Sequence, residues 1–306
     1  MTVSAIPEFS KPGCDDICIR IADITISLSS TDPSMRMHLE GDVERFRVPP
    51  SEPGLRVKAA WGDLSRGFAG EKIFDSGGVW QLFAAENAYQ FCCSAPNLGK
   101  IPYQTARLNP EFTTAEVILH RPFFDTSQSV YPLQYPLDEV LILNLLSRKR
   151  GVEVHACGVI DESGDGLLFT GKSGAGKTTM ARFWEKERGA LILSDDRIIL
   201  RQDKGKIWMY GTPWHGDAKL AYPSRAPLKA VFILRHGPEN RLRAKTGAEA
   251  AALLFSRSFP VFYSPEGLQY TLEFYDRLTA SVPCFEFDAV PNPEVVAFIR
   301  ARTSAL

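Results

Sequence analysis

Apolar and polar positions alternate in short runs through the first part of the chain, which is the pattern of strands with one buried face. Ile17–Leu28 predicts one strand or a strand pair, and Leu55–Trp61 alternates strictly. Ala85–Ala88 separates two further runs and is typical of a hairpin turn. Tyr103–Leu108 and Ala115–His120 continue the series. We therefore expect a β-rich region with no catalytic or metal-binding motif.

The pattern changes after a stretch that contains prolines. Residues 121–136 carry three prolines, which is typical of a linker. Leu137–Arg148 then predicts a helix, because acidic side chains stand at its start and basic ones at its end. We expect a β-rich N-terminal domain over residues 1–130, of unknown role, and a second domain over residues 131–306.

The second region mixes short strands with helices, so its expected fold class is α/β with some α+β character. The expected strands are Val152–Ile160, Leu167–Thr170, Ala190–Ser194, Lys206–Tyr210 and Ala230–Arg235, and the expected helices are Thr179–Arg188, Ala248–Ser256 and Glu294–Ala301.

Composition narrows the function classes. The 306 residues carry 35 basic and 36 acidic side chains, for a formal charge of -1, so no signature of nucleic-acid or membrane-surface binding is present. The longest apolar run, Ala250–Phe255, is far shorter than the ~20 residues of a membrane span. The first residues lack a signal-peptide pattern. With six cysteines in so long a chain, we expect reduced thiols in a cytoplasmic protein, and a packed thiol at Cys157.

The strongest signal is Gly171–Thr178, which matches the phosphate-loop pattern G-x-x-x-x-G-K-[ST] in full. A short apolar strand precedes it and a helix follows, which is the context that this loop requires. Glycines let the backbone N–H groups turn toward phosphate oxygens, Lys177 would reach the β- and γ-phosphates, and the Thr178 hydroxyl would bind Mg²⁺. The residues expected to bind ATP are Gly171, Lys172, Ser173, Gly174, Ala175, Gly176, Lys177, Thr178 and Thr179.

Two adjacent carboxylates, Asp195 and Asp196, follow the apolar strand Ala190–Ser194. A carboxylate at a strand end is where phosphate-loop proteins place a metal or water ligand. Two together allow one to hold Mg²⁺ and the other to act as a base, and the sequence leaves open which does which.

A histidine stands in the strand before the phosphate loop. His155 lies in Val152–Ile160, and only Asp161–Gly166 separates this strand from the next. Six polar residues cannot hold the crossover that parallel neighbours need, so the two strands must form an antiparallel hairpin. That hairpin places His155 opposite about Lys172, where it could contact a phosphate, a metal or an acceptor hydroxyl.

This order of features resembles the catalytic domain of HPr kinase/phosphorylase. A hairpin with histidine, then Gly171–Thr178, then Leu193-Ser-Asp-Asp196 is also similar to ATP-dependent phosphoenolpyruvate carboxykinases. Gly211–Gly216 and Ala226–Arg235 look like segments of HPr-kinase-related proteins, so the resemblance covers about residues 131–306. It implies a P-loop, phosphoenolpyruvate carboxykinase-like mixed-sheet kinase domain.

The resemblance also implies roles. Lys177 and the loop amides would hold the ATP phosphates, and Thr178 with one of Asp195 and Asp196 would hold Mg²⁺. The other aspartate, helped by His155, would take the proton from an acceptor hydroxyl. The implied activity is a Mg-ATP-dependent kinase acting on a serine-type hydroxyl of a peptide, a protein or a small metabolite. No nucleic-acid or membrane partner is expected, and a homo-oligomer is possible.

The chain departs from both families. The Pro-Gly-Arg-Asn signature of the regulatory HPr enzymes is missing, and the corresponding late region reads Phe255–Pro260. The substrate-binding Lys and Arg residues of the carboxykinases have no match. Two alternatives stay open: an ATP-binding protein that recognises a partner without useful turnover, and a carboxykinase-type enzyme.

Secondary candidates are few. Arg225, Arg235 and Arg257 are candidates for an arginine that stabilises the transition state. Arg197 follows the carboxylates and could contact phosphate or pair with an aspartate. His215 could lie on the acceptor side, or pack in a turn.

Overall fold

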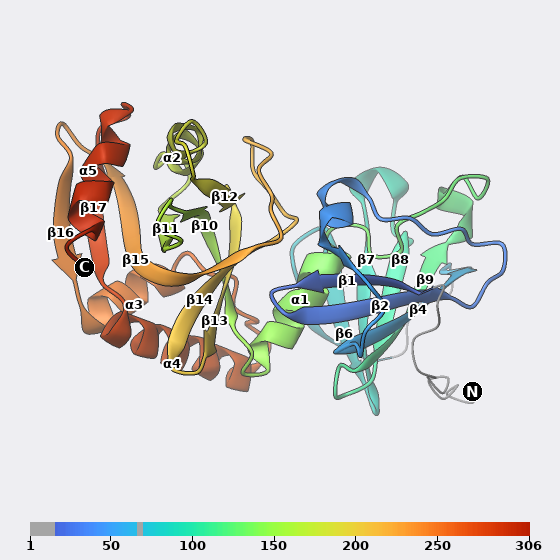
Figure 1. The fold of residues 1–306 in the computed structure, drawn as a ribbon. Helices are drawn as coiled ribbons and strands as arrows, with labels where there is room; N and C mark the ends of the chain where they lie inside the picture. The colour runs from blue at the N-terminus through green and yellow to red at the C-terminus, as the bar shows by residue number, and fades with distance from the viewer. Residues whose placement is uncertain (1–15, 66–69) are drawn as a thin grey trace. The chain divides into compact units, whose positions relative to one another are not determined.

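The structure is a computed structural model that describes residues 16–65 and 70–306. The chain divides into two compact units, Met1–Ile142 and Leu143–Leu306, and helix α1 (Leu137–Ser147) crosses the division (Figure 1). The domain boundary expected after residue 130 stays a prediction. Among the helices of these two described ranges, none is long and apolar enough to cross a membrane.

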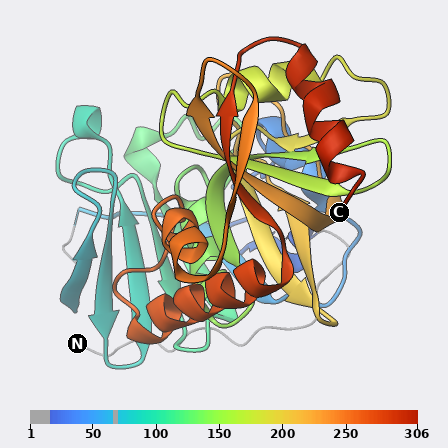
Figure 2. The ribbon, with the colours of Figure 1, turned by 90° about the vertical axis from the view of Figure 1, so that its left-hand side faces the viewer.

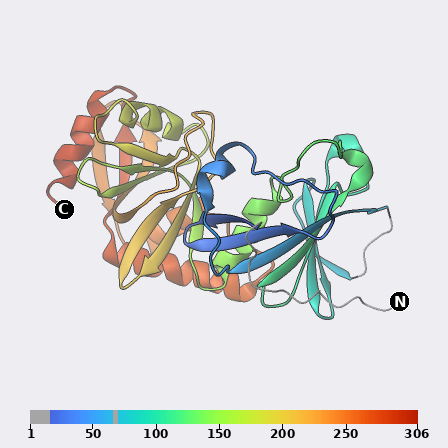
Figure 3. The same ribbon diagram turned by 45° about the vertical axis from the view of Figure 1, so that its right-hand side comes forward.

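The first unit holds a mixed sheet of nine strands in its described part, coloured from blue to green in Figure 3. The strand order is β3-β1-β2-β4-β9-β8-β7-β6-β5. Its strands and 3-10 helices are β1 (Ile17–Ile21), β2 (Ile24–Ser30), η1 (Gly41–Phe46), β3 (Arg47–Val48), β4 (Leu55–Gly62), β5 (Glu71–Asp75), β6 (Trp80–Ala85), β7 (Ala88–Cys93), η2 (Pro96–Leu98), β8 (Gln104–Leu108), β9 (Thr114–His120) and η3 (Arg121–Phe123).

The alternating sequence pattern produces this sheet. In β4 every second residue from Leu55 to Trp61 is buried and the residues between are partly exposed. The segment predicted as a strand or a strand pair is a pair, because Ala22 and Asp23 have φ values of 48° and 58° and turn the chain. The turn at Ala85–Ala88 joins β6 and β7 as predicted.

The second unit is built on a mixed sheet with the order β11-β10-β13-β14-β15-β17-β16, in which β12 also pairs with β10. Strand β15 is long and pairs with β14 at its start and with β11 and β17 farther along. The elements are β10 (Val152–Ile160), β11 (Gly166–Thr170), α2 (Lys177–Trp184), β12 (Leu191–Ser194), β13 (Arg197–Asp203), β14 (Lys206–Gly211), β15 (Arg225–His236), β16 (Arg241–Lys245), α3 (Gly247–Phe255), α4 (Pro265–Ser281), β17 (Cys284–Ala289) and α5 (Glu294–Thr303).

Helices cover both faces of this second sheet (Figure 2). Met180 and Trp184 of α2 and Ile299 of α5 pack with one core, and Leu254 of α3 and Phe274 of α4 pack with the other. Alternate residues of β10 enter the two cores, so the strand is buried on both sides.

Strands β10 and β11 form the antiparallel hairpin that the sequence predicts. The register pairs Ala156 with Thr170, which places His155 beside Gly171, one residue from the predicted position. Where β11 ends and the phosphate loop begins, another segment takes its place beside β10: the N–H of His155 donates to the carbonyl of Arg257 at 2.7 Å, and Val154 bridges to Ser258. Residues 257–259 thereby lie next to the start of the phosphate loop.

Candidate active site

The glycine loop between β11 and α2 forms one wall of the candidate site. Gly174 and Gly176 have φ values of 77° and 101°, a region that residues with side chains rarely adopt. At Gly171 the reason for glycine is space, because a Cβ there would lie 2.8 Å from the Cβ of Ala175. Helix α2 starts at Lys177, and its first N–H groups have no partner within the helix. The loop and helix start therefore offer an anion both donors and a positive dipole end.

Lys177 is a buried cation held by carbonyl groups. Its Nζ donates to the carbonyls of Gly171 at 3.1 Å and Lys172 at 3.4 Å. The residue is 7% exposed, and this burial lowers the pKa of its ammonium, while the nearby charge of Asp196 acts in the opposite direction. A buried ammonium in a loop of N–H donors is an arrangement that favours an anionic ligand.

His155 and Asp196 form a hydrogen-bonded pair. His155 Nε2 lies 2.8 Å from Asp196 Oδ1, and their side chains are 31% and 26% exposed. Since a carboxylate oxygen only accepts, Nε2 carries the proton. Burial by itself would raise the pKa of Asp196, but the hydrogen bond from His155 and the charges of Arg197 and Lys177 outweigh it, so this pKa lies below its ordinary value. The carboxylate is thus ionised at neutral pH and already oriented by the imidazole.

Asp195 is used differently from Asp196. It is 1% exposed, and its carboxylate accepts the N–H groups of Gly216, Ala218 and Leu220 at 2.9, 2.9 and 3.4 Å. A Cβ at Gly216 would lie 2.8 Å from Asp195 Oδ2, so the loop can approach the carboxylate only with glycine there. Asp195 therefore fixes the loop from residue 216 to residue 220, which forms the opposite side of the site.

These residues line one hollow of about 340 Å³, which is large enough for the phosphates of a nucleotide. Among the predicted loop residues, Gly171, Lys172 and Ala175 do not line it. The lining residues are His155, Ser173, Gly174, Gly176, Lys177, Thr178, Thr179, Asp195, Asp196, Gly216 and Asp217.

The structure separates the three arginines that the sequence could not distinguish. Arg235 pairs with Glu286 at 3.1 Å, and the guanidinium of Arg225 lies over the ring of Trp208. Arg257 lies beside the phosphate loop, close enough for its charge to lower the pKa of Lys177. Burial lowers the pKa of Arg257 as well, and within residues 16–65 and 70–306 it forms no ion pair. Of the three arginines, Arg257 is therefore the one whose charge acts on the loop lysine.

The structure also shows the surroundings of His215 and Cys157. Nδ1 of the exposed His215 lies 2.9 Å from the carbonyl of Gly216, so this histidine contacts the first residue of the loop that Asp195 fixes. Cys157 is fully buried, and burial raises the pKa of its thiol, so it is a packed side chain as predicted. All cysteines in the described part of the chain are free and buried, and Cys14 lies outside that part.

The residues that could hold a metal are oxygen donors. Within the residues that the structure describes, no group of three or more His, Cys, Asp or Glu side chains could hold a metal ion. The hydroxyl of Thr178 and the carboxylate of Asp196 line the same hollow. This donor set fits Mg²⁺, which is commonly bound by one or two protein oxygens together with phosphate oxygens and water.

Sequence reasoning missed Glu153 and Phe259. The side chain of Glu153 is fully buried, two residues before His155 on the same face of β10, and Arg197 lies between it and Asp196. The guanidinium carbon of Arg197 is 4.2 Å from the centre of the Phe259 ring. The alternation of Val152, Glu153, Val154 and His155 could have indicated that Glu153 and His155 share a face. Nothing in the sequence indicates that Phe259 joins them.

Comparisons with known proteins do not assign the chain to a family. No family model and no curated protein matches the chain. Among solved structures, the Hpr(Ser) kinase/phosphatase from Coxiella burnetii is similar, with a TM-score of 0.30 and 14% identity, over 50% of this chain and 98% of that one.

Proposed function

We propose that the second unit transfers the γ-phosphoryl group of Mg-ATP to a serine-type hydroxyl of a peptide, a protein or a small metabolite. The observation that carries the proposal is the presence of the His155–Asp196 pair in the same hollow as Lys177 and the glycine loop. A loop of this kind binds phosphates, and an oriented, ionised carboxylate beside it can accept a hydroxyl proton. The resemblance to HPr kinase, with its P-loop mixed-sheet fold, agrees with this reading of the residues.

Each residue then has one task. The loop N–H groups and Lys177 hold the phosphates, and Lys177 leaves the carbonyls of Gly171 and Lys172 to do so. The Thr178 hydroxyl would hold Mg²⁺, which would neutralise phosphate charge. Asp196 accepts the proton of the acceptor hydroxyl while the N–H of His155 keeps its carboxylate in place. Asp195 acts indirectly, because it holds the loop that forms the opposite side of the hollow.

The rate would come mainly from position and charge. Phosphoryl transfer needs little covalent help from a protein, and the transition state spreads negative charge over the transferred group. Lys177 lines the hollow and Arg257 lies close enough to influence it, so both would supply positive charge beside the loop. Both are partly desolvated, so their interaction with a phosphate is stronger than it would be in water.

The test is a transfer assay with γ-labelled ATP, Mg²⁺ and a panel of serine-containing peptides and metabolites. We expect label on an acceptor, lost in Lys177→Ala and in Asp196→Asn. Tight ATP binding with no labelled acceptor would favour a partner-recognition protein without turnover. Oxaloacetate-dependent consumption of ATP would favour a carboxykinase-type enzyme. If the two variants transfer as much label as the unchanged chain, the assignment of the site is wrong.

A further inference from the structure

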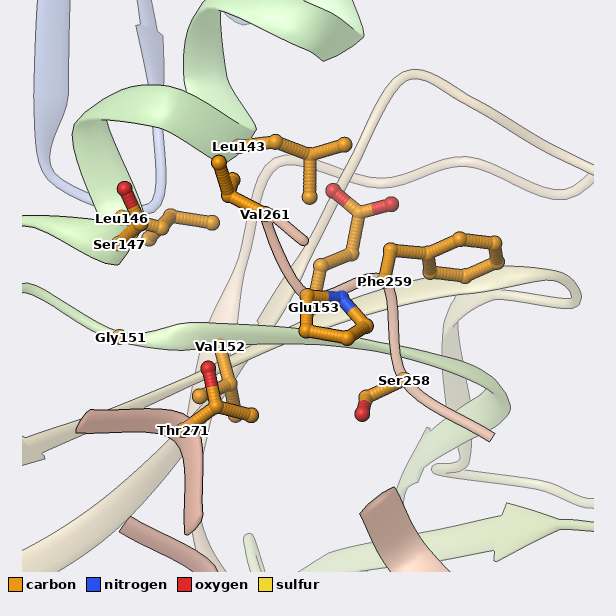
Figure 4. A pocket seen from close by; sticks show the side chains of 11 residues that line it. Leu143, Leu146, Ser147, Gly151, Val152, Glu153, Ser258, Phe259, Val261 and Thr271 are labelled. Carbon is orange, nitrogen blue, oxygen red and sulfur yellow. The ribbon is translucent and has the colours of Figure 1, made fainter. Parts of the chain in front are cut away.

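Glu153 is an acidic side chain in an apolar setting. It lies in β10 with a side chain that is 0% exposed, and it lines a small hollow with Leu143, Val261 and Phe259 (Figure 4). Removing a carboxylate from water is costly unless a cation and hydrogen bonds compensate it.

The compensating cation is Arg197. Its Nε lies 3.5 Å from Glu153 Oε1, and its side chain is 18% exposed. The pairing follows from the sheet register: Arg197 is directly opposite His155, and Glu153, two residues away, is diagonal to it on the same face. The ring of Phe259 covers the guanidinium, since the distance from the guanidinium carbon to the ring centre is 4.2 Å.

Arg197 also contacts the proposed base. Its Nη1 donates to Oδ2 of Asp196, while Oδ1 of Asp196 is hydrogen-bonded to His155. Glu153, Arg197, Asp196 and His155 thus form a continuous row of contacts that ends in the proposed active site.

The contacts of Arg197 affect which oxygen of Asp196 pairs with His155. A guanidinium and a carboxylate often pair through two parallel hydrogen bonds, which would occupy both oxygens of Asp196. Here Glu153 attracts the Nε side of Arg197, Phe259 covers the guanidinium face, and Nη1 donates to Oδ2 of Asp196. Oδ1 of Asp196 is the oxygen that lies 2.8 Å from His155 Nε2.

We propose that Glu153 is a positioning residue for the His155–Asp196 pair and acts through Arg197. This rests on the proposed function, because the pair matters only if it takes part in phosphoryl transfer. Without the Glu153 charge, Arg197 can rotate toward Asp196, pair with both of its oxygens and compete with the imidazole for Oδ1.

The first experiment observes the pair without turnover. The chain has five histidines with two ring nitrogens each, and in a sample with ¹⁵N-labelled histidine His155→Asn identifies the signals from His155. We expect the downfield N–H proton of the His155–Asp196 hydrogen bond to shift or disappear in Glu153→Gln and to be retained in Glu153→Asp. The control is Asp161→Asn, which removes another carboxylate paired with an arginine, Arg300, at the far end of the same hairpin. An unchanged His155 signal in Glu153→Gln would overturn the proposal.

The second experiment measures Mg-ATP turnover. We expect kcat of Glu153→Gln to fall by about 10-fold or more, since a displacement of ~1 Å can cost ~10²-fold in rate. KM for ATP should stay within about 2-fold of that of the unchanged chain. Arg197→Gln should lower kcat too, and Glu153→Gln/Arg197→Gln should be no slower than Arg197→Gln, because Glu153 acts through Arg197. The double variant removes both charges of the Glu153–Arg197 pair, so neither is left buried without the other. It therefore tests the proposal even if a single variant fails to fold.

The two experiments distinguish a failure of the proposed function from a failure of the positioning role of Glu153. If the unchanged chain shows no Mg-ATP turnover, the proposed function fails, and the imidazole signal still tests the role of Glu153. If the unchanged chain turns over and Glu153→Gln keeps its kcat, the positioning role is wrong and the kinase assignment stands.

Discussion

His155 and Asp196 meet across two strands although they are not partners in the sheet. The register pairs His155 with Arg197, yet His155 Nε2 lies 2.8 Å from Asp196 Oδ1. The reason is the bend at residues 195 and 196 between β12 and β13, where the N–H groups of Asp196 and Arg197 both donate to the hydroxyl of Ser194. The bend takes Asp196 out of the strand pattern and turns its side chain toward the imidazole.

Substitution of either member of this pair should reduce the chemical step more than binding. We expect His155→Asn and Asp196→Asn to lower kcat by about 10² to 10⁴-fold, the usual contribution of general acid–base catalysis. ATP affinity, measured by calorimetry in the presence of Mg²⁺, should change little, because Lys177 and the loop remain. Equal losses of affinity and kcat would instead make the pair part of the nucleotide-binding surface.

Asp195→Asn should behave differently from Asp196→Asn. Asp195 accepts three backbone N–H groups, and an amide would turn a donor toward at least one of them. We expect the free energy of unfolding of the second unit to fall by about 1–3 kcal/mol, the cost of a buried group left unsatisfied. Chemical denaturation measures this, and Asp196→Asn is the matched comparison, with lost turnover and little lost stability. The reverse pattern would exchange the roles of the two aspartates.

Lys177→Ala should weaken ATP binding by about 10- to 100-fold, because a hydrogen bond to a charged group contributes about 1.5–3 kcal/mol. The affinity is measured by calorimetry with Mg-ATP. Lys206→Ala, which removes an exposed lysine at the start of β14, is the control and should bind ATP as the unchanged chain does. Equal affinities of the two variants would show that the loop lysine contacts no nucleotide.

Arg257→Met should slow transfer, because the substitution keeps the side-chain length and removes a partly buried cation beside the loop. We expect a loss of about 10²-fold or more in kcat, as for other groups that stabilise transition-state charge. Arg225→Met and Arg235→Met should stay near the unchanged rate, since these arginines lie against Trp208 and Glu286. A larger loss in either of them than in Arg257→Met would contradict this choice.

Much of this architecture could be predicted because its signals are local. The hairpin before the phosphate loop follows from the six polar residues between two strands, and the glycine positions follow from the loop motif. Helix α4 was missed although Ser264 accepts the N–H of Gly267 as an N-cap and Pro265 opens the helix. Those two residues are a usable signal that the apolar pattern alone does not show.

The rest of the site depends on contacts between distant segments. Asp195 and Asp196 look equivalent in sequence, and only the loop from residue 216 to residue 220 distinguishes them. The choice among the three arginines depends on residues 257–259 lying beside β10, which no local pattern encodes. The same segment carries Phe259 to Arg197, more than 60 residues away in the chain.

The ion pairs at the edge of the second sheet should make its stability depend on pH. Glu286 accepts hydrogen bonds from Arg243 at 2.7 Å and from Arg235 at 3.1 Å. The hydrogen bond from Arg243 is the main reason that the pKa of Glu286 lies below its ordinary value of 4.5. A carboxyl whose pKa is lowered by folding stabilises the fold above its unfolded pKa, and this stabilisation is lost as pH falls through the folded pKa.

Glu286→Gln should therefore lower the free energy of unfolding of the second unit at pH 7, by at most about 1 kcal/mol, since these side chains are near the surface. The difference from the unchanged chain should shrink below about pH 4.5 and vanish once Glu286 is protonated in both states. Urea denaturation followed between pH 7 and pH 3 measures it. Added salt should reduce the difference at pH 7, because the pairs are partly exposed. A difference that persisted unchanged at the lowest pH would mean that Glu286 acts through packing rather than through its charge.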